Sequence, residues 1–249
     1  MSIERGTGWE LRLGDFREVF AADERFDAII TDPPYLGACA NPAPESFKHG
    51  RTMHNRRRDR VAAGSPLMRY QTASHLLLTD LSVWQDDHTD GWFLAFNDYP
   101  GERCMRDALP DGRSTPANPV VWVKPGGLVL PCGNSGSTTK AAEFVLASRR
   151  KGIKRGAPEK PGVMTCRAEY NGTADIELAG GKPLDLMRQI IRLYTEPGDL
   201  VCDPFAGGAT TLLAAVIEGR RAVGSEVDPV TFARAVKRLR KGYTPDMFV

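Results

Sequence analysis

A short motif, Asp32-Pro33-Pro34-Tyr35, combines residue types that suit chemistry on an amine. It follows residues 27–31, a largely apolar run that is typical of a buried strand. The two prolines lack backbone N–H donors, so the turn presents carbonyl acceptors. A carboxylate and a carbonyl can each accept one hydrogen of an NH2 group, while the tyrosine ring stacks on the heterocycle that carries it. All four residues are therefore candidate catalytic residues for an exocyclic amine such as adenine N6 or cytosine N4; an ordinary strand-ending turn is the alternative.

A second motif lies far downstream and has the pattern of a ligand loop. Residues 200–202 predict a strand, residues 203–211 a glycine-containing loop, and residues 212–217 a helix. Glycines let the backbone approach a ligand closely, and the free N–H groups at a helix start favour a polar or anionic ligand. The next predicted strand ends in Glu226, 19 residues after Gly207, a spacing at which an acid commonly holds ribose hydroxyls. The pattern predicts a site for an adenosine-containing cofactor.

With these two motifs the chain resembles the amino-methylating DNA methyltransferases, which use S-adenosylmethionine and attack adenine N6 or cytosine N4. In that family Asp-Pro-Pro-Tyr is the catalytic motif and Asp-Pro-Phe-x-Gly-x-Gly the cofactor loop, matched here by residues 32–35 and 203–209. The catalytic motif comes first, which is similar to the circularly permuted beta group of the family. The resemblance covers nearly the whole chain. It implies an α/β, Rossmann-like methyltransferase fold, with a mostly parallel seven-stranded sheet and helices on both faces.

The resemblance also assigns residues to the cofactor site. Residues 10–16 resemble the family strand that ends in Gly-Asp beside the cofactor's adenine, and residues 181–183 resemble the motif at its methionine end. The implied cofactor contacts are Asp15, Phe16, Asp32, Lys182, Asp203, Phe205, Ala206, Gly207, Gly208, Thr210, Thr211, Glu226 and Val227. One position departs from the family pattern, because Ala209 stands where the second loop glycine is expected. Its methyl group would approach the ligand unless Gly208 supplies the same freedom one residue earlier.

Further elements follow from hydrophobic patterns. Residues 91–97 and 118–124 predict two more core strands, and residues 184–194 predict an amphipathic helix. A helical piece is also expected over residues 139–150, in which Glu143, Phe144 and Leu146 resemble family core. A chain of 249 residues is short enough to form one core, so we expect a single domain over residues 1–249.

The charge distribution suggests a polyanionic partner. The net charge is only +2, but basic residues gather in two polar stretches outside the predicted strands. The first belongs to a basic loop insertion at about residues 38–66, and the second lies in residues 127–180, the position of the family's target-recognition segment. Solvated loops are the alternative to phosphate contacts. The candidate DNA-binding residues are Lys48, Arg51, Arg56, Arg57, Arg58, Arg60, Arg149, Arg150, Lys151, Lys154 and Arg155.

Several classes of protein are disfavoured by the sequence. The five cysteines form no Cys-x-x-Cys pair and the four histidines show no ligand spacing, so neither a metal site nor a disulfide framework is predicted. No run approaches the ~20 apolar residues of a membrane span, and the first residues lack the pattern of a secretory signal. We therefore expect a cytoplasmic protein without a membrane association.

The predicted function is methylation of adenine N6 in double-stranded DNA, with the target base extruded from the duplex. Adenine is favoured because family members that act on cytosine N4 usually carry serine in place of Asp32. Cytosine N4, RNA as substrate, and a catalytically silent subunit that binds nucleic acid remain as alternatives. Relatives of the beta group often form homodimers, but no interface is legible in the sequence.

Overall fold

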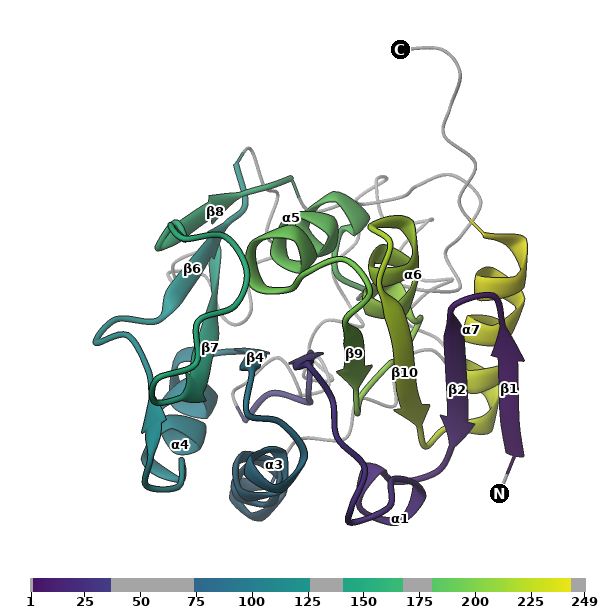
Figure 1. The fold of residues 1–249 in the computed structure, drawn as a ribbon, viewed down its shortest axis with the longest axis horizontal. Helices are drawn as coiled ribbons and strands as arrows, with labels where there is room; N and C mark the ends of the chain where they lie inside the picture. Colours follow the sequence, from purple (N-terminus) through teal and green to yellow (C-terminus); the bar gives the residue numbers. More distant parts are fainter. Residues whose placement is uncertain (1, 37–73, 126–140, 168–180, 243–249) are drawn as a thin grey trace, which may run out of the picture.

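One mixed β-sheet organises the chain, and its central strands run in parallel (Figure 1). The computed structural model describes residues 2–36, 74–125, 141–167 and 181–242. Ten strands lie within these ranges. In spatial order they are β1 (Ser2–Gly6), β2 (Trp9–Leu13), β10 (Arg221–Glu226), β9 (Leu200–Asp203), β3 (Ala28–Thr31), β4 (Trp92–Asn97), β7 (Ala142–Arg150), β6 (Val120–Val123) and β8 (Val163–Thr165), while β5 (Arg113–Ser114) pairs with β7.

The predicted fold class is confirmed. Strands β2, β10, β9, β3 and β4 are parallel neighbours, and β7 runs antiparallel between β4 and β6. These seven strands form the expected mostly parallel sheet, to which β1, β5 and β8 are added. The strands predicted at both motifs, and the two predicted from hydrophobic runs, are all present as β3, β9, β4 and β6.

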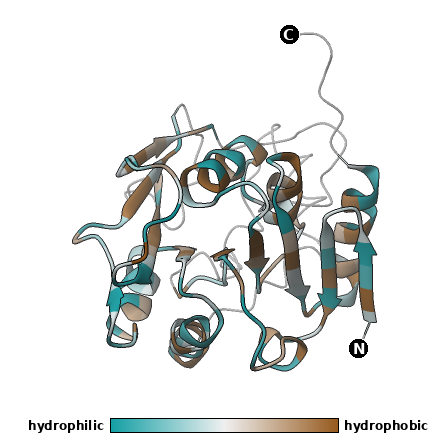
Figure 2. Ribbon diagram, viewed as in Figure 1, coloured by the Kyte–Doolittle hydropathy of each residue, from teal (hydrophilic) through white to brown (hydrophobic). Residues whose placement is uncertain are grey.

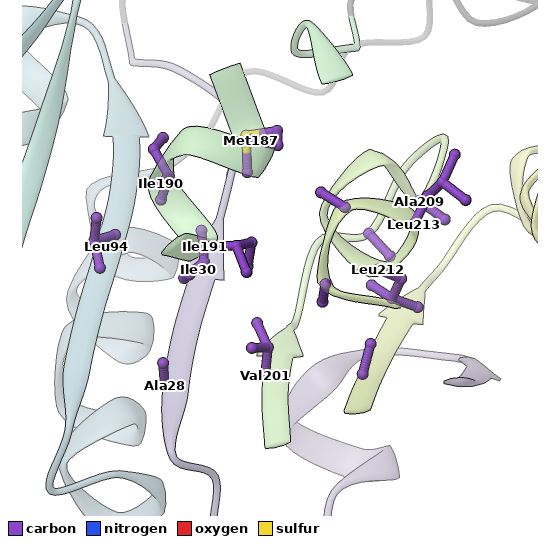
Figure 3. Close-up of a cluster of buried hydrophobic side chains, with 14 of the residues drawn as sticks. Ala28, Ile30, Leu94, Met187, Ile190, Ile191, Val201, Ala209, Leu212 and Leu213 are labelled. Atoms are coloured by element: carbon purple, nitrogen blue, oxygen red, sulfur yellow. The ribbon is translucent and has the colours of Figure 1, made fainter. Parts of the chain in front are cut away.

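Helices cover both faces of the sheet and create two apolar cores. Helices α5 (Leu184–Tyr194), α6 (Thr210–Ile217) and α7 (Pro229–Lys241) pack on one face. Helices α1 (Phe16–Val19), α3 (His75–His88) and α4 (Tyr99–Asp107) pack on the other. Central strands are apolar on both faces for this reason, whereas the edge strand β1 is largely hydrophilic (Figure 2). Side chains of β3, β4 and β9 meet α5 and α6 in the first core (Figure 3).

The prediction of a helix over residues 139–150 is wrong, because residues 142–150 form strand β7, while residues 139 and 140 lie outside the described ranges. The strand is inserted between β4 and β6 and is buried on both faces. Val145 and Ala147 point into one core and Leu146 into the other. A short apolar run that is buried on both faces shows no alternation, so its pattern cannot separate a strand from a buried helix.

Among the described residues, no helix is long and apolar enough to cross a membrane.

Candidate active site

The two motifs meet at the carboxyl ends of neighbouring parallel strands. Strand β3 ends at Thr31, immediately before Asp32, and its neighbour β9 ends at Asp203. The Thr31 hydroxyl donates a 2.7 Å hydrogen bond to Asp203 Oδ1, so residues 172 positions apart in the sequence are in contact. The chain turns in opposite directions after these strands, from β9 to β10 and from β3 to β4. Ligands of open α/β sheets bind at such a switch point.

The glycine loop after β9 is held by groups within the protein. Asp203 is buried, and its Oδ1 also accepts a 3.1 Å hydrogen bond from the Phe205 amide. Burial raises the pKa of Asp203 to about 6, although hydrogen bonds from Thr211 and Thr31 oppose the increase. Asp203 therefore stabilises the conformation of the loop from the buried side. From α7, Arg238 donates hydrogen bonds to the Gly208 carbonyl and to Thr210 Oγ1 over 2.8 and 2.7 Å, which fixes the loop from the other side.

Glu226 closes the same loop at the end of β10. Its Oε2 accepts a 2.9 Å hydrogen bond from the Gly207 amide, and its Oε1 accepts one of 2.8 Å from the Asp228 amide. Burial raises the pKa of Glu226. The Glu226 carbonyl accepts a hydrogen bond from Gly14, the residue before Asp15. Three separate segments predicted to contact the cofactor are therefore adjacent.

Ala209 occupies the position where the sequence departs from the family pattern. It adopts a left-handed conformation with φ 58° and ψ 33°, which costs a non-glycine residue about 1–2 kcal/mol. Its side chain is completely buried and belongs to the core that contains Leu212 and Leu213 (Figure 3). The methyl group is therefore a packing group of the interior.

The predicted adenine contacts differ from each other in accessibility. Asp15 caps α1, and its hydrogen bonds with Arg17 hold the pKa of Asp15 below its usual value. Phe16 is buried against the rings of Phe205 and Trp84, with centroid distances of 5.2 and 5.1 Å. Val227 is 67% exposed. Phe16 thus supports the loop from within the second core, whereas Val227 lies at the surface beside Glu226.

A polar cluster surrounds the carboxylate of Asp32. Lys182 Nζ lies 2.7 Å from Asp32 Oδ2, 2.9 Å from the Tyr35 hydroxyl and 3.0 Å from Glu143 Oε2. The Tyr35 hydroxyl also lies 3.1 Å from Asp32 Oδ1 and 2.8 Å from Glu143 Oε2. Lys124 forms a further ion pair with Glu143 Oε1. The predicted methionine-end residue Lys182 is therefore bonded to the catalytic motif in this state.

The surroundings in the cluster shift the pKa values of its two carboxyl groups, Asp32 and Glu143, in opposite directions. Burial alone would raise the pKa of Glu143, but the ammonium groups of Lys182 and Lys124 outweigh it and lower that pKa to about 2. Burial raises the pKa of Asp32, a shift that Lys182 opposes and Glu143 reinforces. Burial and both carboxylates raise the pKa of Tyr35 well above its usual value, so its phenol stays neutral. Two carboxyl groups with pKa values pushed apart are typical of acid–base sites.

Comparison with known proteins identifies the family. A sequence model described as DNA methylase matches residues 26–237. The chain belongs to the DNA methylase family.

Known proteins that are similar to this chain carry names for both target amines. The Escherichia coli protein named DNA adenine methyltransferase YhdJ is 40% identical over 58 residues, which are 23% of this chain and 20% of that protein. The crystal structure of the M1.HpyAVI–SAM complex covers 93% of this chain and 98% of its own, with a TM-score of 0.66 and 24% identity. The structure titled PvuII DNA methyltransferase (cytosine-N4-specific) covers 92% and 85%, with a TM-score of 0.60 and 18% identity. These structures establish a shared fold.

Sequence reasoning missed two members of the methylase's polar cluster, Glu143 and Lys124. Both come from the antiparallel strands, where Trp122 of β6 lies opposite Glu143 of β7. Because side chains alternate along a strand, Lys124 lies on the same face as Trp122 and reaches Glu143 diagonally. The signal available in the sequence was a single acid at the start of the apolar run 144–147.

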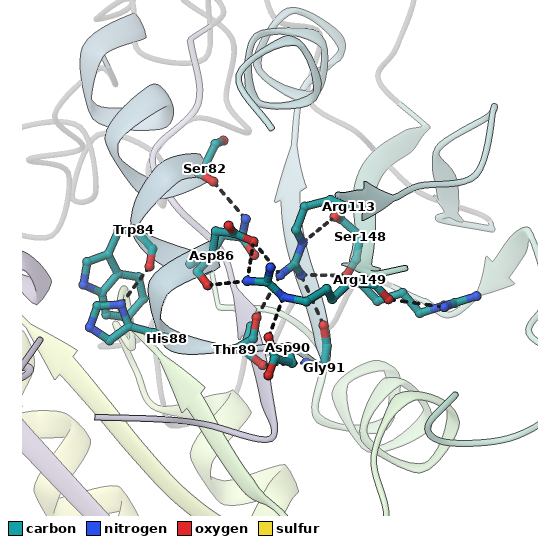
Figure 4. A network of polar contacts seen from close by, with 12 residues as sticks. Ser82, Trp84, Asp86, His88, Thr89, Asp90, Gly91, Arg113, Ser148 and Arg149 are labelled. Atoms are coloured by element: carbon teal, nitrogen blue, oxygen red, sulfur yellow. Dashed lines mark hydrogen bonds and ion pairs between the residues drawn. The ribbon is translucent and has the colours of Figure 1, made fainter. Parts of the chain in front are cut away.

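The second basic stretch lies away from the cluster. Arg155 pairs with Asp27 and Asp199 over 2.5 and 3.2 Å, near the amino ends of β3 and β9. Arg150 pairs with Asp86 and Asp90, beside the buried Arg113 network (Figure 4). Lys151 and Lys154 are exposed, and Arg149 lies over the ring of Trp92. The methylase fold does not bring these residues to Asp32, and their placement lends no support to the predicted DNA contacts.

The first basic stretch, with Lys48, Arg51, Arg56, Arg57, Arg58 and Arg60, lies outside the described residues. Within the described part of the methylase, no group of three or more His, Cys, Asp or Glu side chains is placed to hold a metal ion.

Proposed function

We propose that this methylase transfers a methyl group from S-adenosylmethionine to N6 of adenine in double-stranded DNA. The observation that carries the proposal is the contact between the two motifs. The hydrogen bond from Thr31 to Asp203 holds the start of the Asp32–Tyr35 turn beside the glycine loop, at the carboxyl edge of the sheet. A methyl donor held by the loop and an amine held by the turn would then be neighbours.

The loop residues fit the proposed cofactor. Glu226 is a carboxylate at the end of β10, where ribose hydroxyls would find a charged acceptor. The inward packing of Ala209 leaves its methyl group in the core, so the substitution does not contradict the fit. The M1.HpyAVI structure of similar fold was solved as a SAM complex. When bound, this cofactor would supply an electrophilic methyl group.

Asp32 is proposed to act on the amine directly. Its carboxylate and the Pro33 carbonyl would each accept one N6 hydrogen, which holds the nitrogen lone pair toward the methyl donor. The amine would form its new N–C bond as the bond between that methyl carbon and the cofactor's sulfur breaks, and it would lose one N–H proton to Asp32, whose pKa is raised by burial. Lys182 now bonds Asp32 Oδ2, so it must release this oxygen or share it with the amine. Stacking of the extruded base on Tyr35 would offset roughly 1–3 kcal/mol of the unstacking cost.

Cytosine N4 is the second candidate, because a structure titled cytosine-N4-specific shares the fold. Adenine is preferred because this chain has Asp32 where cytosine-N4 members of the family usually carry serine. The predicted phosphate contacts of Lys48 to Arg60 remain part of the proposal. The arginines at 149, 150 and 155 are left out, because they lie at the opposite end of the sheet.

The test is mass spectrometry of nucleosides after unmethylated duplex DNA is incubated with the purified protein and isotope-labelled S-adenosylmethionine. Labelled N6-methyladenine is expected, and it should be absent with the Asp32→Ala protein. Labelled N4-methylcytosine would keep the mechanism and change the base. No label on DNA would refute the proposal, and a parallel incubation with RNA would then separate an RNA enzyme from a silent binding subunit.

A further inference from the structure

We propose that Glu143, held in place by Lys124, is a positioning residue for Asp32: it fixes Tyr35 and Lys182 beside that carboxylate and preserves its basicity. The inference rests on the proposed methyl transfer, because it assigns Glu143 a role in preparing the proton acceptor. Glu143 belongs to neither motif and reaches the site from β7.

The geometry makes Glu143 the shared anchor of the cluster. Its Oε2 accepts hydrogen bonds from the Tyr35 hydroxyl and from Lys182 Nζ, at 2.8 and 3.0 Å. Its Oε1 accepts from Lys124. The Tyr35 hydroxyl has one hydrogen to donate, and its shorter contact is with Glu143 rather than with Asp32 at 3.1 Å. Glu143 therefore takes up donors that would otherwise turn fully toward Asp32.

The position of Glu143 is fixed on both sides by the sheet. Phe144, the next residue, pairs with Asn97 at the carboxyl end of β4 and with Val121 of β6. Lys124 follows β6, and its backbone amide donates to the carbonyl of Ala141 over 2.9 Å. Its ammonium group also lies 4.5 Å from the centroid of the Trp122 ring. Glu143 and Lys124 are thus carried by paired strands rather than by loops.

The charges around Asp32 define the direction in which Glu143 changes the basicity of Asp32. Lys182 contacts Asp32, Glu143 lies beyond Tyr35, Lys124 neutralises Glu143, and Asp203 lies behind Thr31. Glu143 remains ionised, because its pKa is lowered to about 2. Its negative charge binds Lys182 and repels the charge of Asp32. Without the charge of Glu143, the ammonium group of Lys182 would be paired only with Asp32. Asp32 would then hold its negative charge more readily and be a weaker base.

This role gives a balanced proton path in the proposed reaction. Methylation places a positive charge on the amine nitrogen, whose N–H bond then breaks, and the proton is taken up by the Asp32 carboxylate. Asp32 becomes a neutral acid, a form that burial favours. Lys182 keeps Glu143 as its ionised partner throughout. No further proton acceptor is required within the cluster.

The experiment titrates Asp32 itself in the ligand-free full chain. The protein is labelled with carboxyl-13C aspartate, the Asp32 signal is assigned with Asp32→Asn, and its midpoint is followed by NMR. Glu143→Gln keeps the shape of the side chain and should lower the midpoint by roughly one pH unit or more. Lys124→Gln removes a positive charge that neutralises Glu143, so it should raise the Asp32 midpoint. Glu4→Gln, which breaks the distant pair of Glu4 with Arg240, should leave it unchanged.

Opposite shifts in the two variants, with thermal unfolding showing that both are folded, would support the assignment. The acid limb of kcat against pH should then move in the same directions while KM for DNA changes little. Unchanged midpoints, or shifts of the same sign, would overturn it even if the enzyme is active. Opposite shifts in a protein that methylates no nucleic acid would reject the proposed function but keep the electrostatic role of Glu143.

Discussion

Replacing Thr31 with valine tests the bond that joins the two motifs. Valine has nearly the shape of threonine but lacks the hydroxyl that donates to Asp203 Oδ1 over 2.7 Å. Thr31 is 0% exposed and Asp203 2%, so water cannot readily replace the lost donor. A hydrogen bond to a charged group contributes about 1.5–3 kcal/mol to stability, and one between neutral groups about 0.5–1.5 kcal/mol. The free energy of unfolding should fall by the larger amount wherever Asp203 is ionised.

The pKa of Asp203 determines where that happens. Burial, opposed by the hydrogen bonds of Thr211 and Thr31, raises this pKa from 3.8 to about 6 in the folded protein. The folded chain therefore holds the proton more tightly than the unfolded chain. The resulting stabilisation is complete below the unfolded pKa and is lost as the pH rises toward 6. Because valine removes a donor that favours the carboxylate, its cost should be larger at about pH 8 than at about pH 5.

The assay is urea unfolding of the wild type, Thr31→Val, Asp203→Asn and the double variant at both pH values. In the Asp203→Asn background the side chain no longer titrates, so the cost of the valine should be small and independent of pH. If Thr31→Val lowers the free energy of unfolding equally at both pH values in the protein that keeps Asp203, the reasoning is refuted. A loss below about 0.5 kcal/mol throughout would also refute it, because that is the range of neutral surface substitutions.

Three further predictions concern the two motifs. Asp32→Ala should retain cofactor binding in calorimetry while kcat falls by roughly two to four orders of magnitude, and full activity would remove Asp32 from the reaction. Glu226→Ala should weaken S-adenosylmethionine binding, because the ribose hydroxyls lose a charged acceptor; an unchanged Kd would contradict this. Ala209→Val should lower the free energy of unfolding by at least about 2 kcal/mol, because it places a β-branched side chain at positive φ in a fully buried site. Denaturation of Ala209→Gly as control should show a change within about 1 kcal/mol, since strain relief and lost packing oppose each other.

Most of the sheet could be predicted because its signals are local. Strands such as β3 and β9 combine a short apolar run with a turn or glycine loop directly after it, so pattern and punctuation agree. Strand β7 was mistaken for a helix because its apolar residues face two cores, which removes the period that identifies a strand. Strand β3 is followed directly by Asp32-Pro33-Pro34, whereas the apolar run of β7 continues into Ser148 and residues 149–151, which carry no proline or glycine.

The candidate site was predictable to the extent that its residues lie next to such signals. Asp32 and Tyr35 follow the end of β3 and Glu226 ends β10, so local patterns made them candidates. Whether a basic residue faces DNA is not a local property. Arg155 lies in a basic stretch whose composition suggests phosphate contacts. In the fold it pairs with Asp27 and Asp199 at the amino end of the sheet. Sequence charge counts cannot show which carboxylates the fold brings to an arginine. The cytoplasmic location stays a prediction, and nothing in the described structure addresses the homodimer that the family resemblance suggests.

Glu143 illustrates why the remaining part of the site needed the fold. Its contacts with Tyr35 and Lys182 join residues 108 and 39 positions away, and they exist because β7 inserts antiparallel beside β4. A register shift of one residue would turn Glu143 to the other face of the sheet and expose Lys182 to Asp32 alone. The basicity of Asp32 is therefore tied to strand pairing outside both motifs. A chain with both motifs intact but a different pairing of β6 and β7 would keep the signature of a methylase and lose the electrostatic balance of its acceptor.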